Sequence, residues 1–112
     1  MNQMPTKRRR VALLALASVI AAPVTAQESG DPAAGQRMAV TWCGSCHVVV
    51  PSQRQATSNG APTFAAIAQM TSTTQLGLRA FLQTPHDRML DLQLSREEID
   101  DVAGYILSLR KK

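Results

Sequence analysis

Cysteine is scarce in this chain of 112 residues, which contains only Cys43 and Cys46. A scaffold held together by disulfides is excluded, because one bridge between two such close positions would close a very small loop and stabilise little. A zinc site with four ligands is disfavoured as well, since there is no second cysteine pair and His86 lies far along the chain. The two thiols therefore need another use.

Aromatic residues are also few, at 4% of the sequence. A chain of this length suffices for one domain, and with so few large side chains its own hydrophobic core is limited. No strand-like alternation of apolar and polar residues and no internal repeat are present. These absences disfavour β and repeat architectures and leave a small helical domain.

No apolar run is long enough to span a membrane as a helix, which takes about 20 residues. The longest, residues 11–22, follows a basic block at residues 7–10 and precedes Val24 and Ala26, small residues at the positions that signal peptidase recognises. This order is typical of a secretory signal. We expect a cleaved signal peptide over residues 1–26 and one domain over residues 27–112. Retention of the segment as an N-terminal anchor is the alternative.

Excess charge of one sign is missing from the expected mature chain. The formal net charge is +4, but four of the 12 basic residues lie in residues 7–10 and no acidic residue precedes position 27. Eight basic and eight acidic residues remain, so the mature chain is formally neutral. A basic field of the kind that binds nucleic acid is therefore absent, and no nucleic-acid partner is expected.

The first predicted helix covers residues 33–42. Asp31 suits the N-cap and Pro32 the first helical position. Ala34, Met38 and Trp42 recur at a spacing of four and predict its apolar face.

Three further helical segments follow. A short helix is predicted over residues 63–70, and a capping box at residues 72–75 predicts a helix that ends near Gln83, before Pro85. A second capping box, Ser95 and Glu98, begins the C-terminal helix, whose apolar stripe comprises Ile99, Val102, Ile106 and Leu109. We expect an all-α domain of three to five short helices.

Cys43, Cys46 and His47 form the Cys-x-x-Cys-His pattern of covalent haem attachment. Two thiols at this spacing can each add to one haem vinyl group, and the following histidine then reaches the iron as the proximal ligand. A thioredoxin-like redox pair would need a preceding strand, which the pattern does not predict. A plain disulfide would leave His47 unexplained.

With this motif, residues 27–112 resemble the class I cytochrome c family in its small bacterial form. Gly35 stands where the family has a glycine that lets the N- and C-terminal helices cross closely, and Val102 and Tyr105 resemble the apolar and aromatic pair of the C-terminal helix. Ala39 replaces the usual aromatic partner, for which Trp42 is a possible substitute. The resemblance implies a cytochrome c-like bundle around one covalently bound haem c.

The resemblance also implies two further site residues. Pro62, in a glycine-proline loop, would accept a hydrogen bond from His47 through its carbonyl oxygen. Met89, in the loop before the last helix, would be the sixth iron ligand, although Leu90 follows it where the family commonly has proline. His86, Met70 and an open coordination position are the alternatives.

The function that follows is one-electron transfer rather than catalysis, because two axial ligands leave no room for a substrate at the iron. We expect a periplasmic electron carrier whose partners are redox proteins: a dehydrogenase or quinol-oxidising complex as donor and an oxidase or reductase as acceptor. No stable membrane insertion is expected once the signal is cleaved. The alternative is a haem sensor or small haem enzyme with an open sixth position. Apolar residues that suit a haem pocket, or an ordinary helix core, are Leu76, Leu78, Phe81, Leu82 and Leu92.

Overall fold

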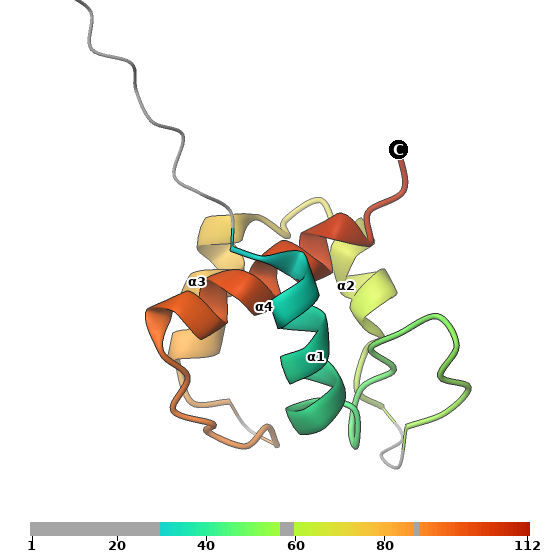
Figure 1. The fold of residues 1–112 in the computed structure, drawn as a ribbon, viewed down its shortest axis with the longest axis horizontal. Coiled ribbons are helices and arrows are strands. Elements are labelled where there is room, and N and C mark those ends of the chain that lie inside the picture. The colour runs from blue at the N-terminus through green and yellow to red at the C-terminus, as the bar shows by residue number, and fades with distance from the viewer. Residues whose placement is uncertain (1–29, 57–59, 87) are drawn as a thin grey trace, which may run out of the picture.

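The computed structural model describes residues 30–56, 60–86 and 88–112. Within these ranges the protein consists of four helices and contains no β-strand, which confirms the predicted all-α class (Figure 1). The expected signal segment, residues 1–26, lies outside the described residues. The helices are α1 (Pro32–Trp42), α2 (Phe64–Gln69), α3 (Gln75–Gln83) and α4 (Arg96–Ser108).

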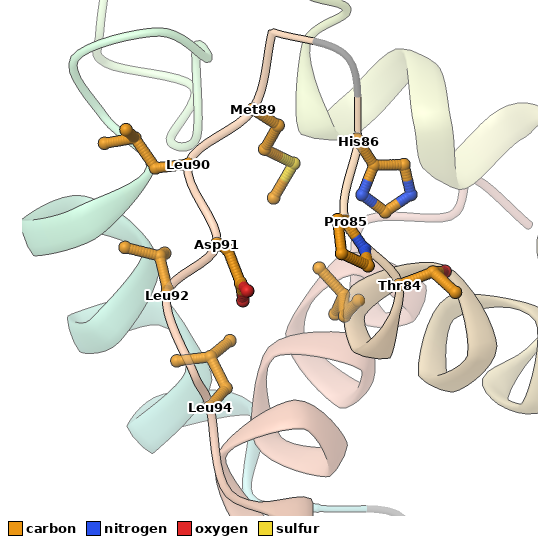
Figure 2. Close-up of a pocket in the computed structure, with 9 residues that line it drawn as sticks. Thr84, Pro85, His86, Met89, Leu90, Asp91, Leu92 and Leu94 are labelled. Atoms are coloured by element: carbon orange, nitrogen blue, oxygen red, sulfur yellow. The ribbon is translucent and has the colours of Figure 1, made fainter.

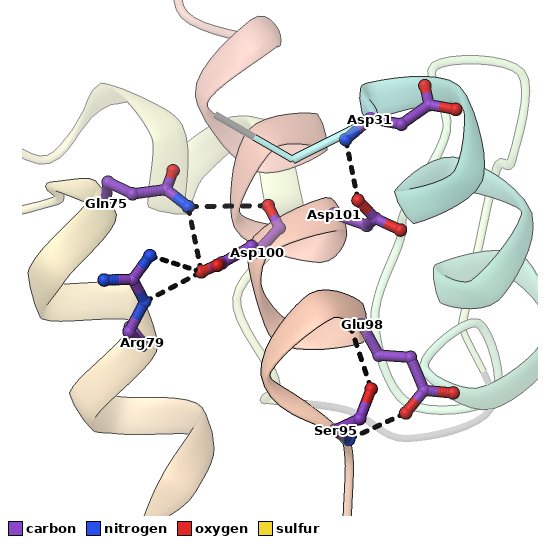
Figure 3. A network of polar contacts seen from close by, with 7 residues as sticks. All are labelled: Asp31, Gln75, Arg79, Ser95, Glu98, Asp100 and Asp101. Atoms are coloured by element: carbon purple, nitrogen blue, oxygen red, sulfur yellow. Dashed lines mark hydrogen bonds and ion pairs between the residues drawn. The ribbon is translucent and has the colours of Figure 1, made fainter. Parts of the chain in front are cut away.

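Helix α4 is the centre of the bundle and contacts each of the other three helices, α1 most extensively. Its buried residues include Ile99, Val102 and Ile106, three members of the predicted stripe. The predicted capping box is present: Ser95 Oγ accepts from the Glu98 amide at 3.2 Å, and the Glu98 carboxylate accepts from the Ser95 amide at 2.7 Å (Figure 3).

Helix α1 begins as predicted, with Asp31 as N-cap accepting from the Ala33 amide at 2.8 Å. Of its predicted apolar face, Met38 packs against the hydrophobic core, but Trp42 is 58% exposed, and the buried residues of the helix are Gly35 and Ala39. Trp42 therefore does not occupy the space that an aromatic residue at position 39 would fill.

The close crossing of α1 and α4 explains why small residues form the buried face of α1. A Cβ atom at Gly35 would lie 2.0 Å from the backbone oxygen of Asp101. The backbones meet here, and any side chain at position 35 would force the helices apart. Asp101 also accepts a hydrogen bond from the Asp31 amide at 2.7 Å, which ties the start of α1 to α4 (Figure 3).

Helix α3 ends at the predicted place, with Thr84 as its C-cap before Pro85, but its predicted start was wrong. The N-cap is Thr74, whose side chain accepts from the Gly77 amide at 3.0 Å, rather than Ser72. An ion pair joins α3 to α4, with 2.7 Å between Arg79 and the Asp100 carboxylate (Figure 3).

Candidate functional site

The Cys-x-x-Cys-His segment forms a tight turn at the end of α1. Cys43 is the C-cap of that helix, and its carbonyl oxygen accepts from the amides of Cys46 at 3.1 Å and His47 at 2.8 Å. Gly44 is required by this turn, because a Cβ there would lie 2.7 Å from the carbonyl oxygen of Val40. The turn brings together the two thiols and the imidazole that the sequence analysis selected.

The two cysteines are free thiols in different surroundings, Cys43 buried and Cys46 exposed. Burial, and secondarily the neighbouring Cys46, raises the pKa of the Cys43 thiol to about 11. Thiol–disulfide exchange relies on a cysteine whose pKa is lowered, so that the reactive thiolate is available near neutral pH. Cys43 itself is therefore not set up as the attacking thiolate of such a pair.

The imidazole of His47 is held by the carbonyl oxygen of Pro62, which lies 2.7 Å from Nδ1. A carbonyl oxygen only accepts, so Nδ1 carries the hydrogen and donates it. The other ring nitrogen, Nε2, then keeps a free lone pair, which is the form in which histidine binds a metal. The ring also contacts Phe64, at 5.4 Å between centroids. Local geometry thus prepares His47 as a metal ligand.

Gln53 is a residue that the sequence analysis missed. Its Nε2 donates to the carbonyl oxygens of Gly44 at 2.9 Å, His47 at 3.0 Å and Gln55 at 3.2 Å, while its Oε1 accepts from the Val49 amide at 3.0 Å. A single amide in a polar loop carries no sequence signal for such contacts.

Met89 lies in the loop that joins α3 to α4. Its side chain is half-buried and points into the space between the two arms of this loop (Figure 2). The pocket there is lined mostly by apolar residues: Leu82, Pro85, Met89, Leu90, Leu92 and Leu94, with Thr84, His86 and Asp91. In Figure 1 this loop and the C-terminal end of α1 lie at the same end of the molecule.

The two alternative ligands have other surroundings. The His86 ring packs on Phe81, at 3.5 Å between centroids. Met70 is the C-cap of α2, and the preceding Gln69 donates to the carbonyl oxygen of Leu109 at 3.2 Å. Met70 therefore lies beside the C-terminal end of α4, whereas the Met89 loop leads into the N-terminal end of that helix.

The donor set and its surroundings fit a haem. Two free thiols and an imidazole with an available nitrogen stand on one turn, which matches the attachment chemistry. An apolar macrocycle also needs apolar walls, and the pocket of the Met89 loop is lined mostly by apolar side chains.

The residues suggested as pocket walls divide into three groups. Leu78 is buried and belongs to the hydrophobic core. Leu82 and Leu92 are half-buried and line the pocket of the Met89 loop. Phe81, 51% exposed, and Leu76, 71% exposed, lie at the surface.

These features define a small helical protein whose Cys-x-x-Cys-His turn is of the kind to which haem is attached. Cytochrome c-552 of Bradyrhizobium diazoefficiens is 36% identical to this chain over 97 residues, which cover 87% of the chain and 92% of that protein. The chain therefore belongs to the class I cytochrome c family, in its small bacterial form, and is a c-type cytochrome that carries electrons. No protein-family model matches the chain, and no solved structure matches it significantly.

Two structural observations bear on the other expectations. Within the three described ranges, no helix combines the length and apolar character needed to cross a membrane. In the same ranges, no three or more histidine, cysteine, aspartate or glutamate side chains gather where they could bind a metal ion.

Proposed function

We propose that the protein is a periplasmic one-electron carrier with a single haem c, attached by thioethers to Cys43 and Cys46 and ligated by His47 and Met89. The observation that carries this proposal is the 2.7 Å hydrogen bond between His47 Nδ1 and the Pro62 carbonyl oxygen, on the same turn as the two free thiols. This bond leaves Nε2 of His47 as the free ligand atom, next to the thiols that would anchor the porphyrin.

The haem, when bound, supplies a one-electron couple at its iron. The protein's own residues would orient the proximal ligand and set the relative stability of the ferrous and ferric states. Pro62 fixes the tautomer and the orientation of the His47 ring. A thioether ligand from Met89 favours the ferrous state, and apolar surroundings add to this preference because oxidation places further positive charge there. With both axial positions filled, electron transfer rather than substrate turnover is the expected chemistry.

Met89 is the preferred sixth ligand for two reasons. The loop that carries it lies at the same end of the molecule as the attachment turn, and its side chain points inward between apolar residues (Figures 1 and 2).

Export to the periplasm is supported by the signal-like order of residues 1–26 and by the family, whose bacterial members are typically exported. The partners are other redox proteins, a dehydrogenase or quinol-oxidising complex on one side and an oxidase or reductase on the other. Such encounters use small surfaces that separate quickly.

An optical spectrum of the ferric holoprotein tests the ligand assignment. We expect the weak far-red band of methionine–iron ligation in the wild type and in Met70→Leu, and its loss in Met89→Leu, which keeps the apolar volume. Retention of the band in Met89→Leu would refute the assignment. Rapid CO binding to the reduced wild type at neutral pH, unchanged by Met89→Leu, would instead support the haem sensor or enzyme.

A further inference from the structure

One side-chain amide holds the loop that follows the haem-attachment turn. Val50 to Gln53 form a turn closed by a 3.0 Å bond from the Gln53 amide to the Val50 carbonyl oxygen, with Pro51 at the position that turns favour. The turn brings the Gln53 side chain back against the chain that precedes it. There its amide makes bonds to backbone groups on both sides of His47.

The bonds made by Nε2 reach into the attachment motif itself. Two of its acceptors are the carbonyl oxygens of Gly44, between the cysteines, and of His47. The Gln53 amide, which lies outside the motif, therefore fixes these two carbonyl groups relative to each other. The turn that carries both thiols and the imidazole is held at Gly44 and at His47.

The Oε1 atom connects the same loop to the hydrophobic core. It accepts from the amide of Val49, a residue that is only 2% exposed. The carbonyl oxygen of Val49 accepts from the Tyr105 hydroxyl on α4 at 2.6 Å. Gln53 therefore links the motif, through Val49, to the central helix.

From these contacts we infer that Gln53 is a positioning residue for the proximal ligand: it fixes the backbone of His47, while Pro62 fixes the ring. The inference rests on the proposed binding of haem at His47. The two supports act at different points, since Pro62 contacts Nδ1 and Gln53 contacts the His47 carbonyl oxygen. An imidazole held at its ring alone could still turn with its backbone.

Two substitutions separate the functions of the amide. Gln53→Met keeps the length of the side chain and removes both the donor and the acceptor. Gln53→Glu keeps its shape and the acceptor for the Val49 amide, but loses the donor to the Gly44 and His47 carbonyl oxygens. Gln69→Met is the matched control, because Gln69 also donates Nε2 to a backbone carbonyl, that of Leu109, elsewhere in the bundle.

NMR of the ferric holoproteins gives two readouts. The haem-methyl shifts report the orientation of the axial imidazole, and we expect both Gln53 variants to change their pattern. Exchange of the Val49 amide should become about tenfold faster in Gln53→Met and stay slow in Gln53→Glu. Gln69→Met should match the wild type in both readouts.

An unchanged haem-methyl pattern in the Gln53 variants would overturn the inference, even if both variants melted at a lower temperature. If Gln53→Glu keeps its helical signal but no longer acquires haem, while Gln69→Met does, the result supports a positioning role. A wild-type protein without haem would refute the proposed function instead, and Val49 exchange would still show whether the Gln53 contact exists.

Discussion

The hydrogen bond from Tyr105 to Val49 offers a direct test of how α4 supports the Cys-x-x-Cys-His segment. The Tyr105 hydroxyl donates to the Val49 carbonyl oxygen at 2.6 Å, and the ring packs against Phe64 at 6.3 Å between centroids. Tyr105→Phe keeps the ring and its packing and removes only the O–H group. The change therefore removes the phenol hydroxyl and with it the buried bond to Val49, two residues beyond His47.

The magnitude follows from burial. Tyr105 and Val49 are 5% and 2% exposed, so water does not readily replace the lost donor. Removing one partner of a buried hydrogen bond costs about 1–2 kcal/mol. In a domain of this size each kcal/mol corresponds to roughly 4–8 °C, so Tm should fall by about 5–15 °C.

The effect should also depend on pH. Burial raises the pKa of Tyr105 above its ordinary value of 10.0. The folded state therefore favours the neutral phenol, and the associated stability is fully present below pH 10 and is lost as the pH rises through the raised pKa. Phenylalanine cannot ionise, so the advantage of the wild type over Tyr105→Phe should shrink at alkaline pH.

Thermal denaturation of both holoproteins, followed by far-UV circular dichroism at neutral and alkaline pH, measures these differences. Tyr105 is the only tyrosine of the chain, so no other phenol contributes. A Tm within about 1 °C of the wild type at neutral pH would refute the argument, because it would lie far below the cost of a buried unpaired carbonyl. A gap that widens at alkaline pH would refute the assigned direction of the pKa shift.

Three further outcomes are expected. Gly35→Ala should lower the free energy of unfolding by about 2 kcal/mol or more in chemical denaturation, because the new Cβ would lie 2.0 Å from the backbone oxygen of Asp101. A stability equal to that of the wild type would contradict the close helix crossing. Ser95→Ala removes the N-cap of α4 and should cost about 1 kcal/mol in the same assay, and no change would show that the cap is unimportant. Hydrogen bonds with Ser95 lower the pKa of Glu98, so the stability that Glu98 contributes is present above pH 4.5 and is lost as the pH falls through the lowered pKa. The stabilities of the wild type and Glu98→Gln, measured against pH, should therefore converge on acidification, and parallel curves would refute this.

The helix termini were predictable from sequence because capping depends on short-range hydrogen bonds. Asp31 with Pro32 and Ser95 with Glu98 mark the starts of two helices, and Thr84 before Pro85 marks the end of a third. The start of α3 was less clear, since several hydroxyl residues precede it. The geometry there favours Thr74 over Ser72.

The buried face of α1 was predicted only in part. Periodicity selected Ala34, Met38 and Trp42, of which Met38 packs against the core and Trp42 is exposed. The crossing with α4 instead selects the smallest residues, Gly35 and Ala39, because the backbones nearly touch. Such a requirement depends on the approach of two distant segments and is invisible in hydropathy alone.

In the candidate site, too, features set by neighbouring residues were predictable from the sequence, whereas contacts between separate segments were not. The spacing of Cys43, Cys46 and His47 is enough to predict haem attachment, because one turn suffices to bring the three side chains close together. The contacts of Gln53 depend on a turn that folds the loop back onto the motif. No composition or spacing rule predicts that this glutamine, rather than Gln55, makes them.

The most direct test of the account is the mass of one peptide. Trypsin cleaves after arginine, and cleavage after Arg37 and Arg54 releases residues 38–54, which contain Cys43, Cys46 and His47. From the exported protein of a cell that matures c-type cytochromes, we predict that this peptide is heavier than its sequence by one haem. A colourless peptide of unmodified mass, with its thiols free or bridged to each other, would contradict the proposed function.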